Sequence, residues 1–347
     1  MVCEGAPSTI LRQWRTWLRR VLVPLLGVVL LSACSPYVYN QEVTGFSAGV
    51  DAVVSSYRAG QQAVDAIVVQ QQQAADATTR TRLRLLPGCT QREPNSAPPK
   101  WQDCAVVPFG VGAAPAPTSV QQALKDAAPA FDALKAYAAS LAAVTAAADE
   151  TALNQATQSL TAAAGDLAKA GARLKPAMAP DRAMVVSAGS LISQGLAFYL
   201  DQRRLAVLRG TVPKVDPAVQ VLGRTVQAAL LTIQMQQLRQ LDRDLLRNSE
   251  PLEAATVGQL TEADYQSKRA ALEYEVTAFN QARAADPTAT VTAMVNAHHR
   301  LAAALQDDTG KGVITAVQTF SVAAGQLKAA IQAASAATTK APAAATP

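Results

Sequence analysis

The sequence of 347 residues has few aromatic side chains, few charges and almost no histidine. Phe, Trp and Tyr together make up 5% of it, Asp, Glu, Lys and Arg make up 16%, and His occurs twice. So few bulky side chains disfavour a core of β-sheets, whereas abundant Ala, Leu and Gln favour helices that approach one another closely. We therefore expect an all-α protein, an elongated antiparallel bundle of about seven or eight helices.

Motifs of common enzyme classes are also missing. The sequence contains no G-x-S-x-G, P-loop, G-x-G-x-x-G or H-E-x-x-H pattern. His298 and His299 are consecutive, and neighbours on a helix point about 100° apart, so we expect a solvated surface pair rather than ligands of one metal. Glu273 and Glu275 likewise face different sides of a helix. We expect no catalytic residue, no metal site and no cofactor.

The chain also lacks a concentrated block of Lys and Arg interleaved with aromatic residues, which makes nucleic acid an unexpected partner. Its formal charge is +5 at pH 7. Four of the 31 basic residues and one of the 26 acidic residues lie in residues 1–33, so residues 34–347 carry a formal charge of +2.

Basic residues precede an apolar segment near the N-terminus. "LRQWRTWLRR" places Arg12, Arg15, Arg19 and Arg20 before the 13 apolar or small residues 21–33. As a helix this segment is roughly 20 Å long, shorter than the hydrocarbon core of about 30 Å. The layout is typical of an export signal rather than of a membrane-spanning helix.

The signal ends in "LSAC", Leu31 to Cys34, which resembles the lipobox of bacterial lipoprotein precursors. The resemblance implies that residues 1–33 are removed and that the thiol of Cys34 carries a diacylglyceryl group. Ser35 stands where an Asp would favour retention in the inner membrane. The resemblance therefore implies a lipid-anchored protein of the cell envelope, at the outer membrane and facing the periplasm.

The chain has four cysteines. Cys3 lies in the segment expected to be removed and Cys34 is the expected lipid attachment site, which leaves Cys89 and Cys104. An even pair in an exported protein predicts a disulfide, here closing a loop of about 16 residues and contributing roughly 3 kcal/mol. The alternative is two free thiols. The pair lies in a Pro- and Gly-rich loop, residues 87–117, which also contains Trp101. We interpret Trp101 either as a contact for a partner or the membrane surface, or as a side chain packed over the disulfide.

Helical patterns cover the remainder. An apolar stripe at nearly heptad spacing, from Val43 to Ile67, predicts a long helix over 39–86, within an N-terminal segment 34–86. Pro, Gly and Asp then divide a bundle over 118–336, in which Pro129 should kink the first helix. The helices expected there are 119–148, 150–174, 181–209, 217–248, 261–285, 290–306 and 313–336. Residues 337–347 are predicted to be a disordered tail.

One internal similarity relates residues 133–170 to residues 293–330 without gaps. "ATQSLTAAAGDLAKA" from Ala156 then aligns with "AVQTFSVAAGQLKAA" from Ala316. Many matches are alanines, which a biased composition also produces by chance, so the alternatives of duplication and coincidence stay open. Duplication would predict two similar helical hairpins.

These observations favour a non-catalytic, lipid-anchored envelope protein that uses its helical faces as a binding or scaffold module. Its expected partners are the membrane, through the anchor, and another envelope protein or a second copy of itself. The alternative is a carrier or sensor that encloses a small apolar ligand between Ala-lined helices. An enzyme with a dispersed site is the third hypothesis, which the scarcity of His and reactive Cys makes the weakest.

Overall fold

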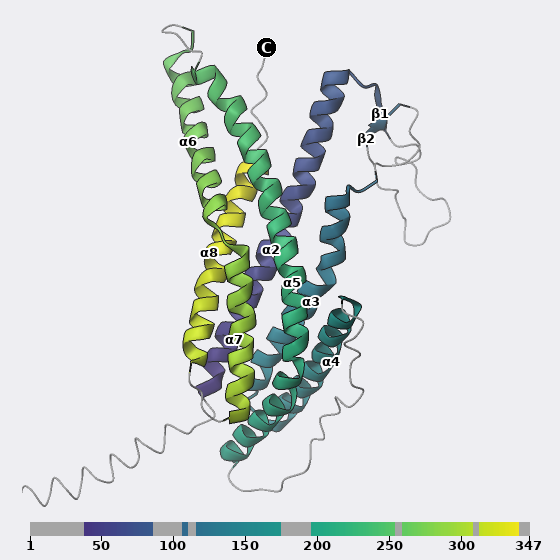
Figure 1. The fold of residues 1–347 in the computed structure, drawn as a ribbon, viewed down its shortest axis with the longest axis vertical. Coiled ribbons are helices and arrows are strands. Elements are labelled where there is room, and N and C mark those ends of the chain that lie inside the picture. The colour runs from purple at the N-terminus through teal and green to yellow at the C-terminus, as the bar shows by residue number, and fades with distance from the viewer. Residues whose placement is uncertain are drawn as a thin grey trace, which may run out of the picture.

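A computed structural model describes residues 38–85, 106–109, 116–174, 196–253, 259–307 and 312–339. The described residues form seven helices and two short strands, drawn in Figure 1. In chain order they are α2 (Val38–Thr79), β1 (Leu83–Leu85), β2 (Val106–Pro108), α3 (Ser119–Ala146), α4 (Glu150–Leu174), α5 (Leu196–Glu253), α6 (Glu262–Ala284), α7 (Pro287–Asp307) and α8 (Val313–Thr339). The expectation of an all-α bundle is confirmed.

The stripe predicted for the first helix is the buried face of α2. Val43, Phe46, Val50, Val53 and Tyr57 are each at most 2% exposed. This helix of 42 residues, about 63 Å long at 1.5 Å per residue, lies against α3, α5 and α8. Figure 1 shows its N-terminal part at the lower end of the bundle and its C-terminal part at the upper end.

Two helix starts are fixed by local hydrogen bonds. Thr118 and Gln121 form a capping box at α3, in which each side chain bonds the backbone N–H of the other residue. Thr261 caps α6 by accepting a hydrogen bond from the backbone N–H of Asp264 at 3.1 Å. Such caps act within one helical turn, so they depend only on residues close in the sequence.

Helix α5 differs from the expectation of two helices, 181–209 and 217–248. The structure has one helix of 58 residues with Pro213 and Pro217 inside it. Each proline removes one backbone donor, which normally interrupts a helix. Here the segment continues because its apolar face is buried on both sides of the prolines, where Val212, Val215 and Val219 are 0% exposed.

The ends of α2 and α8 also differ from the expectation. Helix α2 ends at Thr79 rather than at residue 86, and Arg80 follows with a left-handed φ of 51°. Strands β1 and β2, which were not expected, pair antiparallel with Leu83 opposite Pro108 and Leu85 opposite Val106. Helix α8 extends to Thr339, so residues 337–339 are helical rather than part of a disordered tail.

The bundle is not wholly antiparallel. Helices α2 and α8 run in the same direction, since Gly45 lies against Val317 and Gln70 bonds the carbonyl oxygen of Thr338. Helices α4 and α5 are parallel too, because Arg203 pairs with Glu150 near the start of both and Gly171 contacts Ala218 further along. Parallel neighbours need a long connection, and residues 175–195 separate α4 from α5.

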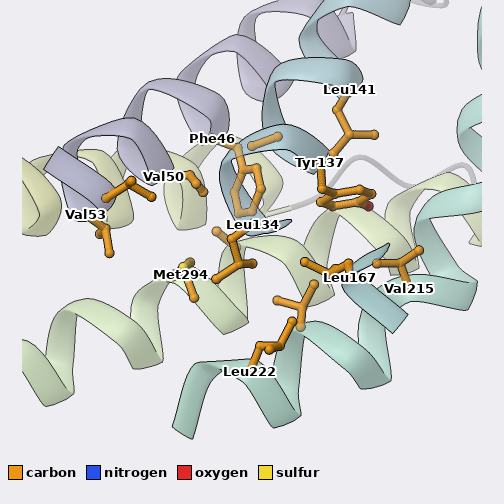
Figure 2. Close-up of a cluster of buried hydrophobic side chains, with 14 of the residues drawn as sticks. Phe46, Val50, Val53, Leu134, Tyr137, Leu141, Leu167, Val215, Leu222 and Met294 are labelled. Carbon is orange, nitrogen blue, oxygen red and sulfur yellow. The ribbon is translucent and has the colours of Figure 1, made fainter. Parts of the chain in front are cut away.

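The main core lies between α2, α3, α4, α5, α7 and α8. Figure 2 shows part of it, where Phe46 of α2, Tyr137 of α3 and Met294 of α7 converge. A second, smaller cluster joins the later part of α5 to α6 and α8, and consists of Leu241, Ala278, Ala282, Ala334 and Ala337. Alanine at most of these positions lets the helix axes approach one another.

The segments 133–170 and 293–330 fall on two helical hairpins, α3–α4 and α7–α8. Their aligned positions are buried alike, each at most 1% exposed: Leu141 and Leu301, Leu160 and Phe320, Ala164 and Ala324, and Leu167 and Leu327. Gly165 and Gly325 also align, and both face open space. The two hairpins therefore use the same register of buried positions, while their duplication stays a prediction.

Within the described residues, no helix has both the length and the apolar composition required to cross a membrane.

Candidate functional site

Polar side chains from three helices meet inside the bundle. Asp216 of α5 accepts hydrogen bonds from Nδ1 of His298, at 2.8 Å, and from Nδ1 of His299, at 2.9 Å, both on α7. The hydroxyl of Tyr137 on α3 lies 2.9 Å from Nε2 of His298. Gln220, one turn after Asp216, donates a further hydrogen bond to the carboxylate at 2.9 Å. We call these five residues the Asp216 network.

This arrangement corrects the interpretation of the two histidines as a solvated surface pair. His298 is 0% exposed, and its ring packs against Phe46 and Tyr137 with centroids 5.7 and 5.6 Å away. The side chain of His299 is 59% exposed. Although consecutive rings on a helix diverge, each histidine reaches a different oxygen of Asp216, so one carboxylate serves both.

The electrostatics of the network follow from burial and hydrogen bonding. Burial of Asp216 acts to raise its pKa, but hydrogen bonds from His298, His299 and Gln220 together outweigh burial and hold the pKa at about 2. Burial raises the pKa of Tyr137 well above its ordinary value, and the charge of Asp216 adds to this effect. Near neutral pH the network therefore contains an ionised carboxylate and a protonated phenol.

The ionised carboxylate fixes how protons are arranged on the rings. A carboxylate only accepts hydrogen bonds, so Nδ1 is the donor in both histidines. In the neutral tautomer with the proton on Nδ1, Nε2 of His298 accepts the hydrogen bond of the Tyr137 hydroxyl. Nε2 of His299 is left for other contacts, because Asp216 holds only the opposite side of that ring.

A groove between α5 and α7 adjoins the exposed histidine. It has a volume of about 380 Å³ and is lined by Gln220, Gly223, Arg224, Gln227, Val291, Thr292, Val295, Asn296 and His299. We call it the α5–α7 groove. The two helices are antiparallel here, since Asp216 bonds His299 while Gln227, further along α5, bonds Thr288 near the start of α7.

The chemistry available at this site is hydrogen bonding at His299. No hydroxyl or thiol of the described residues is bonded to its Nε2, so the activated nucleophile of a Ser–His–Asp triad is not formed among them. Nor do the described residues contain a group of three or more His, Cys, Asp or Glu side chains arranged to hold a metal ion.

The structure describes only some of the other residues singled out from the sequence. Cys34, Cys89, Trp101 and Cys104 are outside the described residues. Of the two glutamates, Glu273 bonds Arg269 on its own helix, and Glu275 bonds Asn248 of α5.

Asp216 and Tyr137 were not predicted from the sequence. The only local signal was that the chain has two histidines and that both are on one helix. Their partners are 82 and 161 residues away from His298, a separation that no local pattern reports.

Comparisons with known proteins add no relative. No protein-family model matches the sequence, and neither the search of curated proteins nor the search of solved structures finds a significant match. Any assignment of function therefore depends on the chain's own residues and geometry.

Proposed function

We propose that this chain is a non-catalytic lipoprotein of the bacterial cell envelope, anchored through Cys34 at the outer membrane and acting in the periplasm as a helical binding or scaffold module. The observation that carries the proposal is the position of the lipobox. Cys34 lies four residues before Val38, the first residue of the 42-residue helix α2. An anchor there would hold one end of the long bundle at the membrane.

The opposite end of the bundle supports a binding role. Figure 1 shows the α5–α6 hairpin and the β1–β2 pair at the end away from the start of α2. Residues 262–271 of α6 are all exposed. Large apolar side chains are exposed on this hairpin as well, among them Leu246 at 67% and Tyr265 at 41%. Such side chains at the membrane-distal end are suited to contact an envelope partner or a second copy of the chain.

Close packing of the interior favours binding at the surface over the alternative of an enclosed apolar ligand. A Cβ at Gly49 would lie 2.5 Å from the ring of Phe320, and one at Gly45 would lie 2.9 Å from Val317. The space between α2 and α8 is therefore filled by side chains rather than left for a ligand.

The β1–β2 pair also supports the disulfide proposed between Cys89 and Cys104. Leu85 pairs with Val106, so the two ends of the segment 86–105 are held together. Cys89 follows the pair by four residues, and Cys104 precedes it by two. The short separations reduce the cost of closing the bridge.

Replacing Cys34 tests the anchor. We expect Cys34→Ala to abolish incorporation of radiolabelled palmitate and to release the protein from the membrane fraction, because alanine has no thiol to alkylate. Two or three acyl chains make a lasting anchor, whereas one binds reversibly. Cys89→Ala is the matched control and should keep the label. Palmitate labelling of the Cys34→Ala protein would contradict the proposal.

Photo-crosslinking in intact cells tests the binding role. We expect a crosslinking residue in place of Tyr265, at the membrane-distal end, to capture a discrete envelope protein or a second copy. The same residue in place of Ile314, which is 52% exposed near the start of α8, is the control at the opposite end and should capture neither. Equal products from the two positions, or none from Tyr265, would argue against a binding surface at the distal end.

A further inference from the structure

The α5–α7 groove combines an apolar floor with a polar rim. Val291 and Val295 of α7 form the floor beside Gly223 of α5. A Cβ at Gly223 would lie 2.8 Å from Cγ2 of Val295, so glycine is what lets the two helices meet there. The longer side chains of Gln220, Arg224 and Asn296 stand around this floor, which is the usual composition of a small-molecule site.

Arg224 is positively charged, and no carboxylate is among the described residues that line the groove. The side chain is exposed, and in the part of the chain that the structure describes it takes part in no ion pair or hydrogen bond. Other arginines of the bundle, such as Arg58 and Arg203, are paired with carboxylates. Asp216 is the nearest carboxylate to Arg224 along α5, but it accepts hydrogen bonds from two histidines and Gln220 instead.

His299 provides an oriented group at the other end of the groove. Its Nδ1 is fixed on Asp216, so Nε2 is the nitrogen left to contact a ligand. Arg224 lies eight residues after Asp216 on the same helix, which is about 12 Å along the axis. Val295 and Asn296 also line the groove.

We propose that the α5–α7 groove binds a small monocarboxylate with a short apolar body, its carboxylate on Arg224 and its other end towards His299. One guanidinium matches one carboxylate through two parallel hydrogen bonds, whereas a phosphate dianion is better matched by several cations. The valine floor contacts the apolar body. This binding activity is independent of the lipid anchor and of a protein partner.

Calorimetric titration of the full-length protein with hexanoate tests the proposal. We expect saturable binding of hexanoate and about tenfold weaker binding, or none, of its neutral analogue hexanamide, because the charge-assisted hydrogen bonds to Arg224 are then lost. Arg224→Gln should weaken hexanoate binding by at least about tenfold. Arg224→Lys should weaken it by less, since lysine keeps the positive charge but lacks the two parallel N–H donors of a guanidinium. Arg239→Gln is the matched control, an exposed arginine of α5 outside the groove, and should bind normally.

Imidazole NMR gives a second readout, because the chain has only two histidines. Hexanoate should shift the resonances of exposed His299 more than those of buried His298. The proposal is overturned if hexanoate gives no saturable signal, if hexanamide or inorganic phosphate binds as tightly, or if Arg224→Gln and Arg239→Gln behave alike. Thermal unfolding of each variant verifies that it is folded.

Discussion

Asp216→Asn is expected to lower the free energy of unfolding by about 3 kcal/mol at pH 7, because it removes the carboxylate to which two histidines donate. His298 is 0% exposed and has no access to water in place of the lost partner. Urea unfolding followed by circular dichroism measures the change. Asp242→Asn, an exposed position of the same helix, should change stability by less than about 0.5 kcal/mol.

The same variant should show a specific dependence on pH. The pKa of Asp216 is lowered from 3.8 to about 2 in the folded protein, so its stabilisation is present above about pH 4 and is lost as the pH falls towards 2. The lowered pKa corresponds to roughly 2 kcal/mol. The difference between the wild type and Asp216→Asn should therefore shrink from pH 4 to pH 2. A difference that is constant over this range would mean that the carboxylate does not stabilise the fold by this route.

Gly49→Val is expected to destabilise the protein by about 3 kcal/mol, at the upper end of the effect of overpacking. Gly49 lies on α2 where that helix meets α8, and even a Cβ would lie 2.5 to 2.9 Å from three ring atoms of Phe320. That ring is 0% exposed and packs against Phe46 with centroids 5.7 Å apart, so it has little room to move. The valine must therefore displace the helix or the ring.

Gly165→Val is the matched control, because nothing lies within 4 Å of a Cβ at this helical position. Its stability should stay within about 0.5 kcal/mol of the wild type. Combining Gly49→Val with Phe320→Ala should cost less than the sum of the two single changes, since removing the ring makes space for the valine. Additive losses would show that the valine and the ring do not compete for the same space.

Helix positions and the buried stripe of α2 were predictable from the sequence. The apolar residues from Val43 to Ile67 that defined the stripe are all buried. Helix α4 has the predicted bounds, Glu150 to Leu174, and α8 begins at Val313 as predicted. These features depend on side chains within one or two turns of each other, where periodicity, caps and helix-breaking residues act.

The candidate site was not predictable in this way. Both histidines were noted, but their nearness in sequence indicated a surface pair, because a helix directs consecutive side chains apart. Only the antiparallel contact of α5 with α7 brings Asp216 between them. Tyr137 carries no local signal of its role, because its partner His298 is 161 residues away in the sequence.

The sequence by itself determined that the chain is helical, where most of its helices begin, and which face of α2 is buried, since these depend on local spacing. The tertiary structure decided that α5 continues through Pro213 and Pro217, that α2 and α8 run parallel, and that His298 is buried on Asp216. The physical reason is that each of these features depends on which helices meet. The burial that carries α5 through its prolines extends over a long face, and the direction of a helix relative to its neighbour depends on the connection before it. The hydrogen bond between Asp216 and His298 joins residues 82 positions apart. Local side-chain patterns do not carry that information.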